Sequence, residues 1–357
     1  MEPSPAFWTG KQVCVTGGTG FLGYHLVLQL LELGARVRVL ALPPDRSHPL
    51  LAQAQVDKQF GNVLDGPAVR QVLADCAVVF HTAGIVTVWG AVARQMHAIH
   101  ADGTRTVLES ASPGALVVHT SSIVTLGPSR MGELRDEESG GKSPDLAFDY
   151  MHAKRAAEAA ALDAAGRGQR VLVTNPGYLV GPDDHLGSVM GRFCVRFWKG
   201  RIPFAPPGGF NLVDVRDAAR GHLLAAEHGK PGQRYILGGE NYRLRDFFVL
   251  LAHVAGMKPR GLPALPSWLF QALAGAAECH AWLTAKEPFP SAQQARLSRH
   301  CWFCRSTRAG RELGYEHRTI ASSMRDTFAW YQARGRLHVR GLNRWWMRPR
   351  AERGNAA

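Results

Sequence analysis

The sequence predicts an α/β protein with a doubly wound parallel sheet and a smaller C-terminal substrate-binding subdomain. Three observations predict this class. A β-branched run at 11–16 leads into a glycine-spaced turn, buried strand-like runs alternate with helical patterns, and loops rich in glycine and proline replace that alternation after Pro182. The 357 residues, of which 46% are hydrophobic, are enough to bury a large core.

The first unit has the pattern of a strand, a tight turn and a helix. Residues 11–16 alternate, glycines follow at Gly17, Gly20 and Gly23, and residues 21–33 repeat apolar side chains at helical spacing. Glycines at this spacing permit close approach of the backbone to a pyrophosphate at the helix N-terminus. The unit therefore predicts a Rossmann dinucleotide-binding fold.

Further runs are expected to form buried parallel strands, because each is short and apolar: 36–42, 77–81, 115–119 and 170–174. Tyr150 and Lys154 lie on a predicted helix that ends near Gly166. These patterns predict a dinucleotide-binding domain over 1–182, a substrate subdomain over 183–333 in which about 211–240 returns to the Rossmann core, and a basic tail over 334–357.

Cysteine use and hydropathy predict a cytoplasmic protein. The six cysteines are too scattered for a secreted disulfide framework: 14, 76, 194, 279, 301 and 304. No run of 18 or more apolar residues appears, and the first residues lack the plan of a signal peptide. The histidines and cysteines form no metal-binding motif, so no metal is expected.

Positive charge is concentrated at the C-terminus. The formal net charge is +13, and residues 331–357 contain seven arginines and one acidic residue, Glu352. With Trp345 and Trp346, this composition could provide peripheral contact with an anionic membrane surface, and a solvated end is the favoured alternative. Nucleic-acid binding is not expected, because no nucleic-acid motif accompanies the charge.

Tyr150 and Lys154 are candidates for proton transfer. Four residues apart on a helix, a phenol and an ammonium lie on one face, where the cation can stabilise a phenolate. The cation is expected to lower the pKa of the phenol from about 10 toward working pH. The alternative is a half-buried aromatic residue beside a solvated lysine.

In this order, the motifs resemble those of the extended short-chain dehydrogenase/reductase superfamily, the NAD-dependent epimerase/dehydratase family, over about residues 10–333. The matching segments are TGGTGFLG at 16–23, HTAG at 81–84, GT at 103–104, HTSSIVTLG at 119–127, YMHAK at 150–154, NPG at 175–177 and NLVDVRDAARGHLLA at 211–225. RYILGGEN at 234–241 and ELGY at 312–315 are similar to the branch that holds 3β-hydroxysteroid dehydrogenases and dihydroflavonol-reductase-like enzymes.

The resemblance implies an NAD(P)-dependent oxidoreductase that acts on CH–OH groups. It assigns catalysis to Ser122, Tyr150 and Lys154. Ser122 would hold the substrate oxygen, with Ser121 as a neighbouring alternative, and Tyr150 would exchange its proton. Lys154 would also bind the nicotinamide ribose. By analogy with the family, a homodimer is expected through helices near Tyr150.

The resemblance also implies a set of cofactor contacts: Gly17, Thr19, Gly20, Phe21, Leu22, Gly23, Arg46, Asn62, Thr82, Ala83, Lys154 and Pro176. The predicted second strand ends at Leu42 without the acid that binds ribose hydroxyls in NAD-preferring members. Asp45 and Arg46 follow, so either NAD or NADP has a partner. The missing acid favours NADP slightly. His100 replaces the family's asparagine, either as a hydrogen-bonding group or, as we favour, in a structural role.

Aromatic residues are expected to line the substrate site: Val88 with Trp89, then Tyr178, Phe193, Phe197, Trp198, Phe204 and Phe210. This lining favours an apolar molecule, although Arg192, Arg196 or Arg201 could reach a phosphate. Residues 262–285 could form a lid or a membrane-facing helix, and an ordinary packed helix is the favoured alternative.

The leading hypothesis is a dehydrogenase or reductase of a secondary alcohol or ketone. A 3β-hydroxysterol or triterpenoid is the favoured substrate, and oxidation of its 3-hydroxyl could be coupled to decarboxylation at C-4. A nucleotide-sugar epimerase or dehydratase is the alternative. A non-catalytic cofactor sensor or membrane-recruited protein is the third hypothesis. It is disfavoured because such a protein would not need Ser122, Tyr150 and Lys154, which this chain contains.

Overall fold

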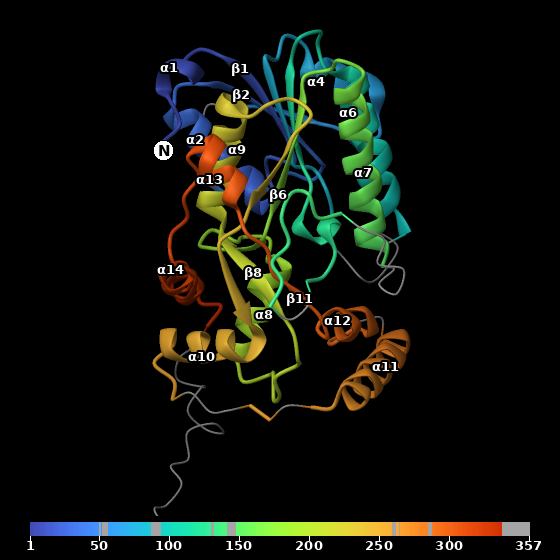
Figure 1. Cartoon of the computed structure of the whole chain (residues 1–357), viewed down its shortest axis with the longest axis vertical. Helices are drawn as coiled ribbons and strands as arrows, with labels where there is room; N and C mark the ends of the chain where they lie inside the picture. The colour runs from blue at the N-terminus through green and yellow to red at the C-terminus, as the bar shows by residue number, and fades with distance from the viewer. Residues whose placement is uncertain are drawn as a thin grey trace, which may run out of the picture.

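Seven parallel strands form the main sheet, and helices cover both of its faces (Figure 1). The structure, a computed structural model, describes residues 1–49, 51, 56–86, 94–129, 132–140, 148–258, 262–263, 265–284 and 288–337. The strand order is β3 (Asp57–Phe60), β2 (Arg36–Ala41), β1 (Gln12–Thr16), β4 (Val78–His81), β5 (Leu116–Thr120), β6 (Val171–Pro176) and β9 (Arg234–Leu237). The predicted doubly wound class is confirmed, and its order reverses between β1 and β4, where such sheets bind ligands.

The strands of this sheet are buried, as the apolar runs predict. All four residues of β4 and all five of β5 are buried, because helices cover both faces. The sequence analysis did not predict β3. Three of its four residues are polar and none is fully buried, because β3 is an edge strand, paired with β2 alone, so it lacks the continuous apolar run of a central strand.

Helices α2 (Phe21–Glu32) and α9 (Val215–His228) pack on one face of the sheet, and α4 (Gly66–Leu73), α6 (Gly103–Ser110) and α7 (Asp149–Gly166) on the other (Figure 1). Leu26 and Leu30 of α2 pack with Leu223 of α9 in the first of these cores. Ala161 and Ala164 of α7 lie in the second. Their small side chains let α7, the helix that carries Tyr150 and Lys154, approach the sheet closely.

A second, four-stranded sheet forms the other half of the molecule. It contains β7 (Tyr178–Val180), β8 (Gly209–Asp214), β10 (Glu240–Arg243) and β11 (Cys301–Trp302). Helices α8 (Val189–Trp198), α10 (Leu244–Val254) and α14 (Ile320–Ala333) pack with it around an aromatic core. Residues 211–214 pair within this second sheet, so the chain returns to the Rossmann layers through α9 and β9.

Helices α11 (Ser267–Thr284) and α12 (Ala292–Leu297) pack together at the lower right of Figure 1. Phe270 and Ala274 of α11 are buried with Ala295 of α12. The remaining short helices are α1 (Pro5–Trp8), η1 (Ala98–Asp102), η2 (Ile123–Leu126) and α13 (Thr307–Leu313). Among the described helices, none combines the length and apolar character needed to cross a membrane.

Candidate active site

The glycine turn between β1 and α2 forms a close-packed cradle. Gly17 has a φ of +72°, and a Cβ at this position would lie 2.8 Å from the Cα of Ala83. A Cβ on Gly23 would overlap the carbonyl oxygen of Gly17. Helix α2 starts directly after the turn, and no side chain caps its N-terminal N–H groups. This arrangement fits the pyrophosphate of a dinucleotide, which binds such N–H groups.

The end of β4 is fixed beside this cradle. Thr82 Oγ1 donates to the carbonyl oxygen of Thr16 at 2.7 Å, and the Ala83 N–H donates to Thr16 Oγ1 at 3.3 Å. Pro176 is the last residue of β6, at the same carboxyl edge of the sheet. Thr82, Ala83 and Pro176 therefore lie on the edge where the resemblance places the cofactor.

Arg46 and Asn62 lie in the loops that follow β2 and β3, and both side chains are exposed. Asn62 Oδ1 accepts a hydrogen bond from the Leu64 N–H at 3.0 Å, which shapes the loop before α4. Asp45, next to Arg46, accepts a hydrogen bond from Lys58 Nζ at 2.7 Å. Lys58 and then Ser47 lower the pKa of Asp45 to about 2.

Tyr150 and Ser122 meet at the carboxyl end of β5. The Ser122 hydroxyl lies near the Tyr150 hydroxyl and acts to lower the pKa of the phenol. Ser121 points elsewhere, and its hydroxyl donates to Glu158 Oε2 at 2.5 Å. The geometry therefore favours Ser122 over Ser121 as the partner of Tyr150.

The pKa of Tyr150 is raised to about 12 rather than lowered, because burial outweighs the effect of the Ser122 hydroxyl. The expectation that Lys154 brings the phenol toward working pH is therefore wrong for the protein without ligands. Lys154 instead directs Nζ at the carbonyl oxygen of Thr120, at 2.8 Å. Tyr150 is thus a protonated phenol near neutral pH in this state.

Lys154 is itself strongly perturbed. Its side chain lies within the protein, with only 6% of the residue exposed. Burial lowers the pKa of Lys154 to about 8, and the negative charge of Glu158 acts in the opposite direction. The ammonium therefore stays charged at pH 7 but titrates close to that pH.

Glu158 is a central residue that the sequence analysis missed. Its Oε2 accepts hydrogen bonds from Ser121 Oγ, from Thr125 Oγ1 at 2.9 Å and from Asn175 Nδ2 at 2.8 Å. Its Oε1 accepts one from Arg234 Nη1 at 3.0 Å. One signal was available in the sequence, because this acid stands four residues after the motif lysine and so shares its helix face.

His100 contacts Tyr150 from the π-helical turn η1. The two ring centroids lie 5.6 Å apart in an edge-on arrangement. His100 Nε2 lies 2.8 Å from the carbonyl oxygen of Ile85, and a side chain at Gly84 would overlap the imidazole. Burial, and then the charge of Lys154, lower the pKa of His100 to about 3. A neutral imidazole thus supports the backbone beside Tyr150.

The predicted aromatic lining is only partly found near the tyrosine. Tyr178 packs on Phe210 at a centroid distance of 5.3 Å, and burial, followed by the proximity of Tyr150, raises the pKa of Tyr178. Trp198 was wrongly assigned to the substrate site. It is fully buried, and its indole N–H donates to the carbonyl oxygen of Leu251, because its face of α8 turns into the core.

Three other candidates pack against aromatic residues of neighbouring helices, and the remaining two cannot be placed. Phe193 and Phe197 stack on Phe248, at 5.6 and 5.0 Å between centroids. Phe204 contacts Phe270 of α11 at 5.3 Å. The predicted wall residues at 88 and 89 lie outside the described residues.

Among the described ranges, no three His, Cys, Asp or Glu side chains are grouped to hold a metal ion.

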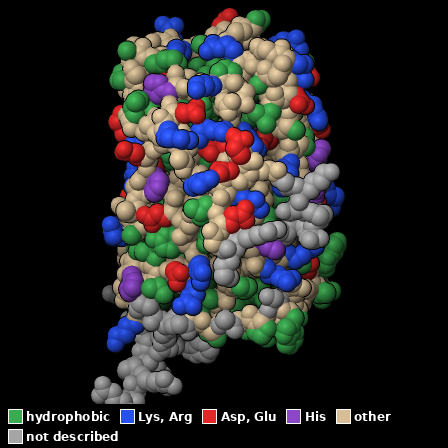
Figure 2. All heavy atoms as spheres, in the orientation of Figure 1, with side chains coloured by type: hydrophobic (Ala, Val, Ile, Leu, Met, Phe, Trp, Pro, Cys, Tyr) green, Lys and Arg blue, Asp and Glu red, His purple; other side chains and the backbone are tan. Residues whose placement is uncertain are grey.

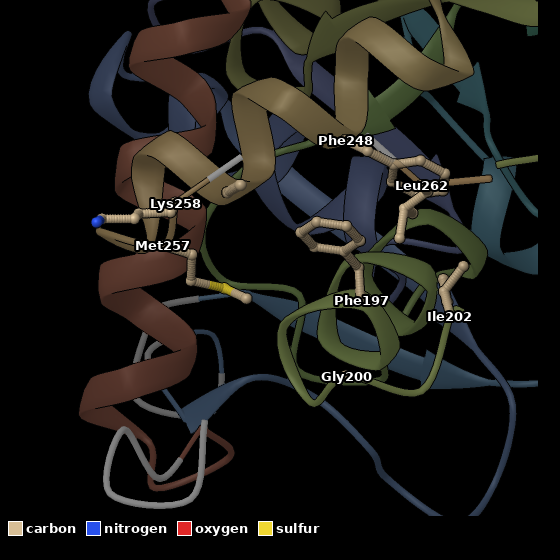
Figure 3. A pocket seen from close by; sticks show the side chains of 8 residues that line it. Phe197, Gly200, Ile202, Phe248, Met257, Lys258 and Leu262 are labelled. Atoms are coloured by element: carbon tan, nitrogen blue, oxygen red, sulfur yellow. The ribbon is translucent and has the colours of Figure 1, made fainter. Parts of the chain in front are cut away.

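A small apolar pocket lies between α8 and α10 (Figure 3). Its lining consists of Phe197, Gly200, Ile202, Phe248, Ala252, Met257, Lys258 and Leu262. Its volume of about 30 Å³ holds roughly one water molecule. No lining residue belongs to the cofactor or proton-transfer set, so this pocket is not the substrate site.

The sequence model of the NAD dependent epimerase/dehydratase family matches residues 13–238. This range includes the glycine cradle, the serine pair, the tyrosine–lysine helix and the last strand of the main sheet. The chain belongs to this family. It is an NAD(P)-dependent oxidoreductase with the Rossmann fold.

Two relatives match along nearly their whole length. The chain is 30% identical to sterol demethylase protein B of Methylococcus capsulatus over 328 residues, which cover 90% of this chain and 99% of the relative. It is 30% identical to human 3 beta-hydroxysteroid dehydrogenase type 7 over 352 residues, or 89% and 95% of the two chains. The dTDP-glucose 4,6-dehydratase of Bacillus anthracis, solved with NAD, shares the fold at a TM-score of 0.72 and 16% identity, covering 91% and 97% of the chains.

Replacing Lys154 with methionine should remove a pH dependence of stability. The folded pKa of about 8 lies below the reference value of 10.5, so the unfolded state binds more protons between these pH values. The free energy of unfolding of the unsubstituted protein should therefore rise relative to K154M as the pH increases from 8 to 10.5. The gain should be about 3 kcal/mol.

Urea unfolding at pH 7, 8, 9 and 10 measures this difference. Lys258→Met, at an exposed position, serves as the control, and its stability should run parallel to that of the unsubstituted protein across this pH range. If the stabilities of K154M and the unsubstituted protein run parallel across this range, the buried ammonium does not titrate as described.

Proposed function

We propose that the protein is an NAD(P)-dependent dehydrogenase or reductase that acts on a secondary alcohol or ketone of an apolar substrate, with a 3β-hydroxysterol or triterpenoid favoured. One observation carries this proposal. The hydroxyls of Ser122 and Tyr150 meet beside the buried ammonium of Lys154, at the sheet edge that also holds the glycine cradle.

The roles of the three side chains follow from their chemistry. Ser122 would hold the substrate oxygen while Tyr150 transfers its proton, as a donor to a ketone or as an acceptor from an alcohol. Lys154 would stabilise the phenolate in the alcohol direction and bind the nicotinamide ribose. The nicotinamide, when bound, supplies or accepts the hydride. Because the pKa of Tyr150 is about 12, the free protein holds the phenol in its donor form.

The favoured reaction is oxidation of a 3-hydroxyl next to a C-4 carboxyl group. Once Tyr150 has released its own proton to solvent, transfer of the hydroxyl proton to the resulting phenolate and of hydride to the nicotinamide would leave a β-keto acid. Such an acid loses carbon dioxide readily, because the electron pair of the broken C–C bond is delocalised into the new ketone. The protein then needs no further catalytic group beyond the proton-transfer set.

Two observations support an apolar substrate. Tyr178 and Phe210 lie near Tyr150, so part of its surroundings is aromatic. Two relatives at 30% identity carry sterol or steroid names, sterol demethylase protein B and 3 beta-hydroxysteroid dehydrogenase type 7, whereas a relative from Synechocystis at 32% identity is named a putative dihydroflavonol 4-reductase. The competing hypothesis is a nucleotide-sugar epimerase or dehydratase. It is supported by membership of the epimerase/dehydratase family and by the fold shared with dTDP-glucose 4,6-dehydratase.

A cofactor-coupled screen across sterols, triterpenoids, flavonoids and nucleotide sugars tests the proposal. We expect sustained cofactor reduction with a 3β-hydroxysterol, fastest with a 4-carboxysterol and accompanied by carbon dioxide release. Tyr150→Phe should lower kcat by about 10³-fold, because general acid–base catalysis contributes about 10²–10⁴.

Tyr178→Phe is the matched control, since it removes a neighbouring phenol outside the proposed set, and it should retain most of kcat. Turnover of nucleotide sugars without net cofactor consumption would instead establish the epimerase or dehydratase. Full activity of Y150F would defeat the mechanism with any substrate.

A preference for NADP is proposed from the loop after β2. Asp45 is the acid nearest the strand end, and its carboxylate is already bound by Lys58 and Ser47. Arg46 is exposed beside it. Because the Asp45 carboxylate already has these partners, it is poorly suited to bind ribose hydroxyls. The Arg46 guanidinium can instead donate hydrogen bonds to a 2′-phosphate.

Arg46→Ala should weaken NADP binding about tenfold and leave NAD binding within twofold, because a charge-assisted hydrogen bond contributes about 1.5–3 kcal/mol. Fluorescence titration with both cofactors measures this. Arg36→Ala, an exposed position at the opposite end of β2, should change neither affinity. Tighter binding of NAD than NADP by the unsubstituted protein would reverse the proposed preference.

Peripheral membrane contact is proposed through the basic tail and α11. The tail beyond Leu337 lies outside the described residues, so its contribution rests on its composition. On α11, Trp268 and Trp282 are 71% and 79% exposed. Ala272, Cys279 and Leu283 lie on the same face, which is therefore apolar and turned to solvent. Hydrophobic side chains gather over the lower right of the molecule, where α11 lies (Figure 2).

Trp268→Ser combined with Trp282→Ser should reduce cosedimentation with anionic vesicles about tenfold, because burying a large apolar side chain contributes about 1.5–3 kcal/mol. Leu64→Ser, at an exposed apolar position on the loop before α4, should have no effect. Truncation after Leu337 measures the tail separately. Unchanged vesicle binding in both the double variant and the truncated chain would exclude this contact.

A further inference from the structure

The segment that follows β7 contacts both α2 and the loop after β2. His25 of α2 directs Nε2 at the carbonyl oxygen of Pro182, at 3.2 Å. His185 directs Nε2 at the carbonyl oxygen of Arg46 in the loop after β2, also at 3.2 Å. A carbonyl oxygen only accepts, so each of these hydrogen bonds requires an N–H at the ring nitrogen. The start of the second half of the molecule is thus joined to the glycine-turn helix and to the loop that carries Arg46.

His185 has a carbonyl oxygen beside each ring nitrogen. Its Nδ1 lies 3.2 Å from the carbonyl oxygen of Asp183, and its Nε2 faces that of Arg46. The backbone of His185 is itself held, since Arg336 Nη2 donates to its carbonyl oxygen at 3.0 Å. The imidazole therefore connects its own segment to a residue that lies 139 positions earlier in the chain.

A second histidine, His48, anchors the loop after β2 from within the protein. Only 1% of His48 is exposed. Its ring packs on Tyr24 of α2, with centroids 4.4 Å apart, and edge-on to His185, with centroids 5.2 Å apart. Its Nε2 lies 3.6 Å from Asp183 Oδ1 and 3.5 Å from Arg334 Nη2. The loop is thus tied to α2, to the segment after β7 and to the end of α14.

The backbone at Asp183 turns in an unusual way between these contacts. Asp183 has a φ of +63°, in the left-handed region that residues other than glycine seldom adopt. Such a conformation persists only where the surroundings determine it. Here the carbonyl oxygen of Asp183 accepts from the His185 N–H at 2.8 Å, and its carboxylate lies beside His48. This turn places Pro182 beside α2 and His185 beside the loop after β2.

Arg46 stands between anchored neighbours in that loop. Asp45, which precedes it, accepts a hydrogen bond from Lys58 Nζ at 2.7 Å, and His48, two residues after it, is buried. The carbonyl oxygen of Arg46 is held by His185, whereas its side chain is exposed. The backbone of Arg46 is therefore fixed before a ligand binds, so less conformational entropy is lost on binding.

We propose that His185 is a positioning residue for cofactor choice, because it holds the backbone from which the Arg46 guanidinium binds the 2′-phosphate of NADP. This role depends on the proposed preference for NADP. His185 acts through Arg46 rather than by contact with the cofactor. NAD has no 2′-phosphate, so the loss of His185 affects NADP binding and spares NAD binding. A residue of the second half of the molecule thus contributes to cofactor selection by the Rossmann half.

Fluorescence titration with NADP and with NAD tests this role. His185→Ala should weaken NADP binding about fivefold and leave NAD binding within about twofold, because one hydrogen bond to the loop is lost. His185→Gln keeps an N–H donor of similar reach and should bind both cofactors within about twofold of the unsubstituted protein. His253→Ala, at an exposed position on α10, is the matched control and should change neither affinity. If H185A alters folding, His185→Asn replaces it, because the shorter amide cannot reach Arg46.

A double variant separates positioning from a general effect on the loop. If His185 acts through Arg46, R46A/H185A should lose about tenfold in NADP affinity, as R46A alone does, rather than the product of about fiftyfold. Multiplied losses, equal weakening of NAD and NADP in H185A, or an H185A variant that binds NADP like H253A would each overturn the positioning role. Normal NADP affinity in R46A would instead remove the proposed NADP preference, and the role of His185 with it. The measurement is cofactor binding, so failure of the proposed reaction on an apolar substrate leaves it unaffected.

Discussion

The buried carboxylate of Glu158 is the interaction on which the candidate site depends. It ties α7 to the loop after β5 through Ser121, to β6 through Asn175 and to β9 through Arg234. These segments are distant in sequence, and the parallel sheet brings their ends to one edge. With Ser121 held by the carboxylate, the next residue, Ser122, is the one that meets Tyr150.

Burial at this edge sets the protonation states of the site. It lowers the pKa of Lys154 to about 8 and that of His100 to about 3, and it raises the pKa of Tyr150 to about 12. The protein therefore keeps a neutral imidazole and a protonated phenol around one cation. Glu158 partly offsets the cost of burying that cation, because its negative charge raises the pKa of Lys154.

The second half of the molecule has two unusual helix surfaces, one basic and one apolar. Helix α8 buries an apolar face in the aromatic core and turns a basic face to a cleft. Helix α11 buries Phe270 and Ala274 but, unlike an ordinary surface helix, also turns Trp268 and Trp282 to solvent. None of these residues belongs to the proton-transfer set of Ser122, Tyr150 and Lys154.

The sequence by itself determined most of the Rossmann half, because its central strands are continuous apolar runs. Its glycine turn also requires a residue without a Cβ at Gly17. It also placed Tyr150 and Lys154 on one helix face, because four-residue spacing is a local property. It missed β3 and misassigned Trp198, since an edge strand carries no strong pattern and an aromatic residue can face either side of α8. Only the tertiary structure decided the partners of Glu158 and the direction of the Tyr150 pKa, because burial and long-range hydrogen bonds depend on segments that meet only in the folded chain.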